Sequence, residues 1–422
     1  MKNNSTNQVS PKPQLDQEVQ KASLKPVWLL SVVLFVASFA GSYFYFAPSS
    51  SKITVADSPA EVTGARRRLN TDLPRTEECP MNGMMYPKPV REIWEGRRPI
   101  TAIVENHLDS RPQSGLSKAD VIYEAVAEGG ITRFLGVFYC NVASEDVRIG
   151  PVRSARVYFA KWAYEYGLNP IFVHVGGANN ICGNCPGGVK PVGTVTREVD
   201  AFRLLSDWGW RAAKGNTMDG GTNVGVPTMW RDAERIPGAA YEHTFMASTD
   251  LLFDEAKKRG FGATDEKGVA WSSTFKPWKF ADSLTLAGAP ATSVSYSFWK
   301  NKPDYDVAWK FDSASGKYLR FHADKPHMDM DYEGTQISAK NLIIQFVVEK
   351  GPVDKEYHMY YENLGTGKAM FFVEGKMVEG TWRRAKLTDR TVFYDSKGQE
   401  FPIVRGEVWI SALPIGNEVL YQ

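Results

Sequence analysis

The feature that most constrains this chain is an apolar run of 21 residues, Val27–Ala47, that contains no charged side chain. As an α-helix rising ~1.5 Å per residue it would extend about 31 Å, which matches the hydrocarbon core of a bilayer. Trp28 lies near one end, and Tyr43 and Tyr45 lie near the other, where aromatic side chains favour membrane interfaces. The run therefore predicts one transmembrane helix over residues 27–47.

A cleavable signal peptide is the alternative interpretation, with Trp28–Phe39 as its apolar part and a cut after Ala40. The long polar leader and the continuation of the apolar run past Ala40 favour an uncleaved anchor. Lys12, Lys21 and Lys25 flank the N-terminal end of the run. The positive-inside rule then predicts a cytoplasmic leader over 1–26 and a body that lies outside the cell membrane.

The rest of the chain divides by composition and periodicity into three parts. Residues 48–98 are rich in Ser, Ala and Pro, then in Arg and Pro, which predicts a stalk. Residues 99–265 alternate strand-like and helix-like patterns, and residues 266–422 show short strand-like runs between turns. The expected fold class is α+β: a layered α/β-type N-terminal domain, then an all-β C-terminal domain, both preceded by the transmembrane helix.

Apolar runs and caps locate the elements of the N-terminal domain. Strands are expected over 100–104, 121–126, 134–140 and 171–175, and helices over 150–167 and 248–259. Ser248 or Thr249 is the expected N-cap of the second helix, and Gly260 ends it. In the C-terminal domain, eight β-like runs between residues 294 and 413 predict a sandwich or barrel.

Charge and cysteine content narrow the function classes. A formal net charge of +2 gives no reason to expect a nucleic-acid partner. Two disulfides fit the four cysteines of an exported body, with Cys182–Cys185 as the first expectation and Cys79–Cys140 as the matching pair. A four-cysteine zinc site is disfavoured because there is one CxxC pair, so no metal site is expected. P-loop, GxGxxG, HExxH and GxSxG motifs are absent from the sequence.

Residues 99–421 resemble the extracytoplasmic YerB-like lipoprotein family. The matching stretches are AIVENH (102–107), SRPQSGLSKADVIYEAVAEGGITRF (110–134), GPVRSAR with a following tyrosine (150–158), FVHVGG (172–177), a Tyr-x-Arg strand (318–320), SAKNLII (338–344), GTW (380–382) and a final Gly-x-x-Trp-Ile (406–410). The resemblance implies the fold and an extracytoplasmic location, and leaves the activity open because the family is one of unknown function.

The chain departs from that family in two places. Lipoprotein members carry a lipidated cysteine just after a short signal, but here the first cysteine is Cys79, so the transmembrane helix is expected to replace the lipid. Where the family tends to have Pro-His-Asn, this chain has Glu242-His243-Thr244.

Polar residues between 105 and 156 form the densest candidate binding region. The predicted ligand-binding residues are Glu105, Asn106, Arg111, Gln113, Glu128, Arg133, Arg153 and Arg156. Guanidinium groups beside a helix start suit a phosphate or carboxylate, and residues three apart on a helix share a face. Glu124 and Glu128 are expected to pair with the arginines or to hold a divalent cation. A buried Arg–Glu network that only fixes the fold is the competing interpretation.

His174, His243 and Glu124 are the candidate catalytic groups. His174 ends a strand next to Gly176-Gly177, a common site position in layered folds. The two histidines would act together as an acid–base or metal pair only if the fold brings them together.

Two functions therefore remain open. The first is an anchored cell-envelope protein that binds an anionic envelope component or a protein partner. The second is an enzyme, a phosphotransferase or hydrolase, acting on a phosphorylated envelope glycan or a lipid-linked precursor. The order of Thr132-Arg133, the pair Arg153 and Arg156, and a later Gly-Gly is similar to the LytR-CpsA-Psr phosphotransferases.

Overall fold

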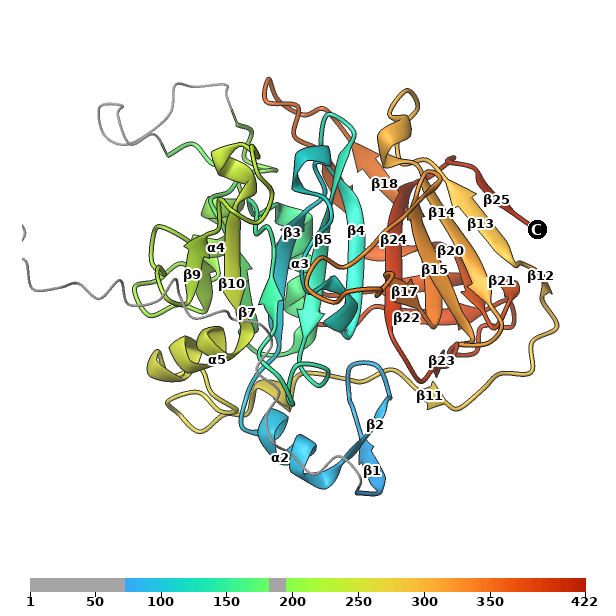
Figure 1. Cartoon of the computed structure of the whole chain (residues 1–422), viewed down its shortest axis with the longest axis horizontal. Coiled ribbons are helices and arrows are strands. Elements are labelled where there is room, and N and C mark those ends of the chain that lie inside the picture. The colour runs from blue at the N-terminus through green and yellow to red at the C-terminus, as the bar shows by residue number, and fades with distance from the viewer. Residues whose placement is uncertain (1–72, 182–194) are drawn as a thin grey trace, which may run out of the picture. The chain divides into compact units, whose positions relative to one another are not determined.

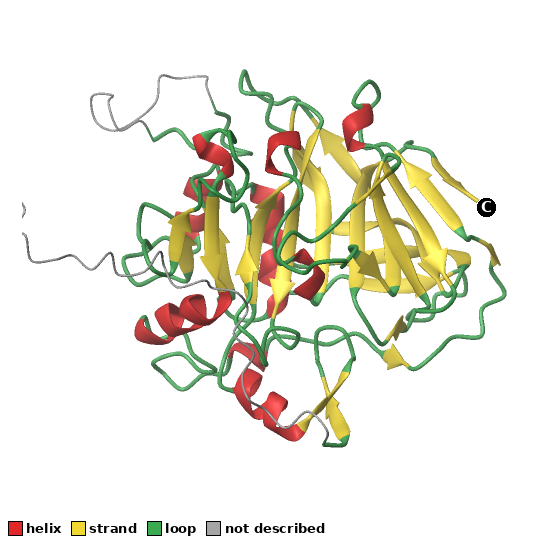
Figure 2. Cartoon of the chain, viewed as in Figure 1, coloured by secondary structure: helices red, strands yellow, loops and turns green. Residues whose placement is uncertain are grey.

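The computed structural model describes residues 73–181 and 195–422, which all belong to one compact unit. Strands dominate it and helices are few, so the α+β expectation is confirmed at that level (Figure 2). Across the two described ranges, no helix combines the length and apolarity needed to cross a bilayer. The leader over 1–26, the predicted transmembrane helix over 27–47, and Cys182 and Cys185 lie outside the described residues.

A twelve-stranded sheet runs through both halves of the chain. Ten strands follow the order β12-β21-β20-β18-β24-β4-β5-β3-β7-β8, while β19 pairs with β18 and β22 with β21. Their bounds are β3 Ile100–Glu105, β4 Val121–Glu128, β5 Ile131–Phe138, β7 Ile171–His174, β8 Thr217–Asp219, β12 Ala289–Pro290, β18 Asn341–Lys350, β19 Tyr360–Glu362, β20 Gly365–Val373, β21 Lys376–Arg384, β22 Val392–Asp395 and β24 Val408–Pro414.

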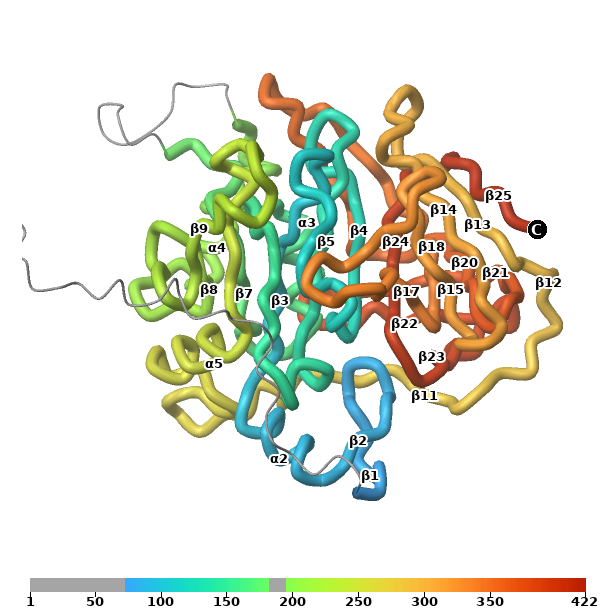
Figure 3. The backbone as a smooth tube through the Cα atoms, viewed as in Figure 1, coloured from blue at the N-terminus to red at the C-terminus, as the bar shows by residue number. Residues whose placement is uncertain are grey.

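The strand β24 joins the two halves, because it lies between β18 and β4 and is parallel to both (Figures 1 and 3). Val408 is opposite Val121 and Ile410 is opposite Tyr123. Both strands are near-continuous buried runs, as expected for a strand covered on two faces. Strands from the two sides of the expected 265/266 boundary therefore share one sheet.

A second, six-stranded sheet packs on the C-terminal part of the first and makes a sandwich. Trp309 of β14 meets Trp409 of β24 edge to face, with ring centroids 5.1 Å apart, and the hydroxyls of Tyr296 and Ser411 are 2.7 Å apart. Its strands are β13 Ser293–Tyr296, β14 Val307–Asp312, β15 Lys317–His322, β16 Lys325–Pro326, β17 Ser338–Ala339 and β25 Val419–Tyr421.

Smaller elements complete the chain. Strands β6 Arg148–Ile149, β9 Met229–Arg231 and β10 Phe245–Ser248 form a three-stranded sheet, and β11 Phe280–Ala281 pairs with β23 Ile403–Val404. The α-helices are α2 Lys88–Glu95, α3 Val157–Ala163, α4 Ala201–Asp207 and α5 Thr249–Lys258. Helix α5 begins as predicted, because the Ser248 hydroxyl accepts a hydrogen bond from the Leu251 amide at 3.2 Å.

The helix expected over 150–167 is wrong in its first half. Helix α3 begins only at Val157, and the residue before it, Arg156, is extended. The preceding segment is held extended by its neighbours: the Arg153 amide donates to the Ile103 carbonyl at 2.9 Å, and the Ala155 amide donates to the Gly176 carbonyl at 3.0 Å. Arg153 and Arg156 therefore do not share a helix face.

Residues 73–98, expected to belong to a stalk, are folded onto the body. Strands β1 Arg75–Glu78 and β2 Met85–Pro87 pair as a hairpin, and α2 follows directly. A disulfide joins Cys79 to Cys140, as predicted, and Trp94 is buried. Composition did not show this, because Trp94 packs on residues distant in sequence, such as Tyr139.

Candidate functional site

Strand β4 separates two environments. Adjacent residues of a strand point to opposite faces, so Tyr123 stacks on Trp162 of α3 while Glu124 points toward the second sheet. There Glu124 meets Arg320 of β15, whose Nη2 donates to both carboxylate oxygens at 2.9 and 3.0 Å. Both side chains are fully buried, so this ion pair is closed to solvent.

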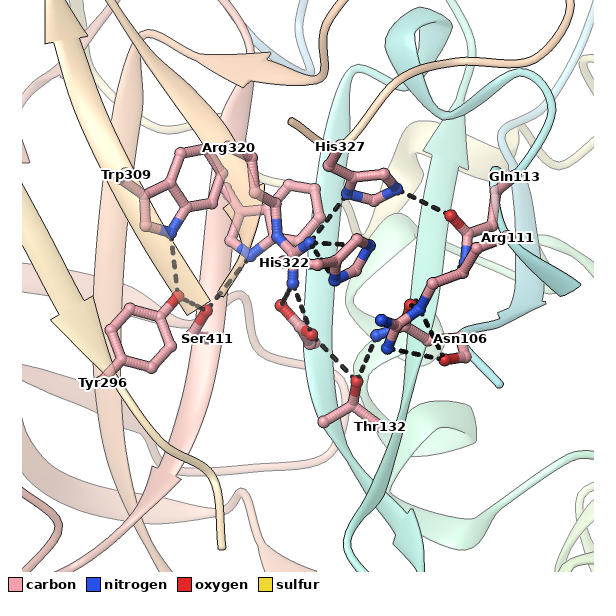
Figure 4. Close-up of polar contacts among 12 residues, drawn as sticks. Asn106, Arg111, Gln113, Thr132, Tyr296, Trp309, Arg320, His322, His327 and Ser411 are labelled. Carbon is pink, nitrogen blue, oxygen red and sulfur yellow. Dashed lines mark hydrogen bonds and ion pairs between the residues drawn. The ribbon is translucent and has the colours of Figure 1, made fainter. Parts of the chain in front are cut away.

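The Arg320–Glu124 pair is part of a closed ring of hydrogen bonds, whose first half begins at Arg320 (Figure 4). Arg320 Nη1 donates to His327 Nδ1 at 2.8 Å, and His327 Nε2 lies 2.7 Å from Gln113 Oε1. Gln113 Nε2 then lies 3.1 Å from Asn106 Oδ1 and 2.9 Å from the Glu105 carbonyl. This half of the ring links the second sheet to the loop after β3.

The ring closes through the central sheet. Asn106 Nδ2 donates to Thr132 Oγ1 at 2.7 Å, and the Thr132 hydroxyl donates to Glu124 Oε1 at 2.9 Å. An arginine can only donate and an ionised carboxylate can only accept. Along the chain of hydrogen bonds that runs from Arg320 through the other ring members to Glu124, each residue consequently donates to the next. This direction fixes the His327 tautomer with its proton on Nε2 and the orientation of the Gln113 and Asn106 amides.

The two histidines next to Arg320 are uncharged in this environment. Burial, then the charge of Arg320, lowers the pKa of His327 far below its usual range. Burial, then His327 and Arg320, lowers the pKa of His322 in the same way. The ring therefore carries the charges of Arg320 and Glu124 alone.

A cavity of about 570 Å³ opens beside the ring, with Arg111 in its wall. Arg111 Nε donates to Asn106 Oδ1 at 3.0 Å, and its Nη1 donates to the Asp304 carbonyl at 2.8 Å. Burial, then Arg320, lowers the pKa of Arg111 to about 10, so it stays charged at neutral pH. Arg320 is therefore bonded to the buried carboxylate of Glu124, while Arg111 acts on that carboxylate only through its charge.

A second cluster lies on the other side of the β3 terminus. Glu105, buried at the end of β3, accepts from Arg153 Nε at 2.8 Å through one oxygen, and its other oxygen lies 2.8 Å from His243 Nδ1. The ring of His243 stacks on that of His107, with centroids 4.6 Å apart. Asp109 lies beside them in the short 3-10 helix Leu108–Ser110.

Glu128 gathers two of the predicted arginines. Its two carboxylate oxygens pair with Arg133 and Arg156, both of which are almost fully buried. Burial opposes ionisation of Glu128, but the two arginines outweigh it and lower its pKa to about 2. Arg133, Arg153 and Arg156 were expected to converge on one anion, and this is wrong in the structure, because Arg133 and Arg156 meet on Glu128 while Arg153 meets Glu105.

His174 has separate partners. Its Nδ1 lies 2.8 Å from the Gly176 carbonyl and 3.6 Å from the carboxylate of Asp219, and its side chain is fully buried. His243 instead contacts Glu105 and His107, so the structure shows no contact that pairs the two predicted histidines among the residues it describes.

Several members of these clusters were not among the predicted site residues: His107, Asp109, Thr132, Arg320, His322 and His327. A signal for two of them exists in β15, where every second side chain is buried. Arg320 and His322 occupy those inward positions, and a charged residue at an inward strand position demands a buried partner. His107 and Asp109 carry no such signal.

The described body is thus a β-rich α+β protein whose two halves share a sheet and enclose a polar ring. Its fold is similar to that of the crystal structure of the YerB protein from Bacillus subtilis, with a TM-score of 0.61 and 24% sequence identity, covering 82% of this chain and 100% of the other. The chain is also 28% identical over 346 residues to "Putative lipoprotein YerB" of Bacillus subtilis (strain 168), which covers 81% of this chain and 88% of that protein.

The family follows from two further matches. Residues 88–190 match the N-terminal domain of the protein of unknown function DUF3048, and residues 294–410 match its C-terminal domain. The chain belongs to this YerB-like family.

Proposed function

We propose that this chain is an extracytoplasmic cell-envelope protein that binds an anionic ligand in the cavity beside Arg111. The location is supported by the Cys79–Cys140 disulfide, because such bonds persist in oxidising compartments. The name of its Bacillus relative, a lipoprotein, points to the same side of the membrane. Since Cys79 is cross-linked here, attachment through the predicted helix over 27–47 replaces a lipid in this proposal.

The charges of the buried groups beside the cavity are the observation that favours an anionic ligand. Arg111 and Arg320 are close enough for the charge of Arg320 to act on Arg111. Glu124 is the buried carboxylate that offsets them, and exposed Asp304 adds to its effect on Arg111. Arg111 is partly exposed and forms part of the cavity wall, so its charge is the one that a ligand can reach. A guanidinium group favours carboxylate and phosphate groups, which it binds with two parallel hydrogen bonds.

The rim of the cavity limits how much charge a ligand can bring. Exposed Lys325 adds a cation, while Asp304 and Asp324 add two exposed carboxylates. An anion with one or two charges suits this balance better than a polyanion. The enzyme alternative stays a prediction. Its candidate group Glu124 is buried in the ring, where Arg320 and Thr132 donate hydrogen bonds to it.

Thermal melting of the full chain with inorganic phosphate and with acetate, at constant ionic strength, tests the proposal. We expect either anion to raise the melting temperature of wild type and of Arg75→Gln, whose arginine is exposed on β1. Arg111→Gln should remove the shift. An equal shift in Arg111→Gln and wild type would overturn the proposal.

A further inference from the structure

We propose that His107, Asp109 and His243 form a binding site for a transition-metal dication of the zinc class. The site lies just beyond the end of β3. None of its three residues lines the Arg111 cavity, and it would bind a cation where the cavity would bind an anion. One potential ligand atom from each of the three residues lies within 4.8 Å of the others. Imidazole nitrogens and a carboxylate oxygen are ligands that zinc prefers.

His243 has the environment of a metal ligand whose other ring nitrogen is fixed by a carboxylate. Its Nδ1 lies 2.8 Å from Glu105 Oε2, and Glu105 is itself held by Arg153 through its other oxygen. A carboxylate that accepts the Nδ1 proton leaves the lone pair on Nε2 and orients the ring. His243 Nε2 makes no hydrogen bond with the residues that the structure describes, and the side chain is 7% exposed.

The other two ligands are free to adjust. The His107 side chain is 32% exposed and that of Asp109 is 64% exposed. The Asp109 amide donates to His107 Nδ1 over 3.3 Å, a long hydrogen bond that costs little to lose. His243 therefore supplies the fixed ligand. Asp109, in the short 3-10 helix Leu108–Ser110, and His107, the N-cap of that helix, supply the two that close on the metal.

Metal binding requires a specific movement of His107. The two imidazole rings are stacked with an angle of 10° between their planes, and an imidazole lone pair lies in the plane of its ring. A metal cannot lie in two parallel planes, so the His107 ring must turn. Ligand atoms around tetrahedral zinc are roughly 3.4 Å apart, given bonds of about 2.0–2.2 Å, so the three atoms must also approach one another.

The coordination chemistry leaves room for more than the three protein ligands. Three protein ligands with a water in a fourth position are the pattern of an open zinc site. Glu242, which precedes His243 in the sequence, is exposed. Its carboxylate can reinforce the dication electrostatically without serving as a ligand.

Zinc binding to the full chain, measured by competition with a chromophoric chelator, tests the site. The reference carries Cys182→Ser and Cys185→Ser, so that neither cysteine can compete for zinc. We expect one zinc per chain in the reference, and at least tenfold weaker binding in His107→Gln and in Asp109→Asn. Asp109 is exposed, so its replacement leaves the fold intact and keeps the test decisive even if a histidine variant unfolds.

Two further variants separate a metal site from a structural cluster. Glu105→Gln should weaken zinc binding by about 10–100-fold without removing a ligand. His358→Gln is the matched control, because His358 Nδ1 also lies 2.8 Å from a carboxylate, that of Asp354, and it should bind zinc like the reference. Absence of stoichiometric binding in the reference, or unchanged affinity in both His107→Gln and Asp109→Asn, would overturn the proposal.

Cobalt substitution gives a second readout. Bound Co²⁺ should show visible absorption bands of a low-coordinate site in the reference, and Asp109→Asn should lose them or shift them. Because neither assay contains phosphate or acetate, failure here leaves the Arg111 proposal standing, and failure of the anion test leaves the metal site standing.

Discussion

Arg320 and Glu124 are 196 residues apart in sequence, yet Arg320 Nη2 bonds to both oxygens of Glu124 in the interior of the protein. One comes from the second sheet and the other from the central sheet. The pair therefore holds the two sheets in one relative position, and the ring through His327 and Gln113 extends the same connection to the loop after β3.

Breaking this pair from one side should be costly. Arg320→Gln leaves the Glu124 carboxylate buried without its cation, and we expect the free energy of unfolding to fall by about 3–5 kcal/mol. The double variant Arg320→Met with Glu124→Gln should recover a large part of that loss, since both charges of the ion pair are then removed. Denaturant unfolding measures both, and a double variant no more stable than the single one would contradict the account.

The ring should be sensitive at its neutral members too. Asn106→Leu removes the donor to Thr132 and the acceptor for Gln113, leaving buried polar groups unsatisfied. We expect a loss of about 1–3 kcal/mol in urea unfolding. Gln399→Leu changes an amide in a loop of exposed and half-buried residues and should cost under about 0.5 kcal/mol.

Two of the predicted anion-binding arginines, Arg133 and Arg153, should differ in what their loss does to stability. The Arg133 side chain is 4% exposed and paired with Glu128, while that of Arg153 is 23% exposed. Arg133→Gln should cost about 3 kcal/mol or more, and Arg153→Gln about 1–2 kcal/mol because His243 still contacts Glu105 and water can reach the site. Equal losses in chemical unfolding would contradict this ranking.

The carboxylate of Glu128 should produce acid sensitivity. Burial raises its pKa, but Arg133 and Arg156 lower it further, from 4.5 to about 2. Because the folded pKa lies below the unfolded one, the ionised group stabilises the fold above about pH 5, and this contribution is lost as the pH falls toward 2. The stability difference between wild type and Glu128→Gln should shrink by about 2–3 kcal/mol from pH 6 to pH 2. Glu379→Gln, exposed on β21, should show no such trend.

The disulfide ties the folded N-terminal hairpin to the central sheet. Cys79 and Cys140 are separated by 61 residues, so their cross-link removes considerable freedom from the unfolded chain. We expect the double variant Cys79→Ala with Cys140→Ala to lose about 2–5 kcal/mol in the free energy of unfolding. Peptide mapping under non-reducing conditions should recover the two cysteines in one cross-linked fragment, and two unlinked peptides would refute the pairing.

Local patterns in the sequence were enough for many elements. Periodicity and a capping serine predicted α5, and apolar runs predicted strands such as β3, β7 and β24, because these signals act over a few neighbouring residues. The incorrect prediction of the segment before α3 has the complementary reason, because there the deciding interactions are not local. The segment before α3 has a helical pattern, but hydrogen bonds to Ile103 and Gly176 hold it extended, and those partners are distant in sequence.

The site shows the same division. The sequence by itself determined that Asn106, Arg111 and Gln113 would lie close together, since one short loop carries them after the strand that ends at Glu105. Only the tertiary structure decided what they meet: Arg320 and His327 come from β15 and the chain after it, and His243 from a loop 138 residues beyond Glu105. A buried charge selects its partner by distance in the folded state, and that distance is set by how the two sheets pack, which no local pattern encodes.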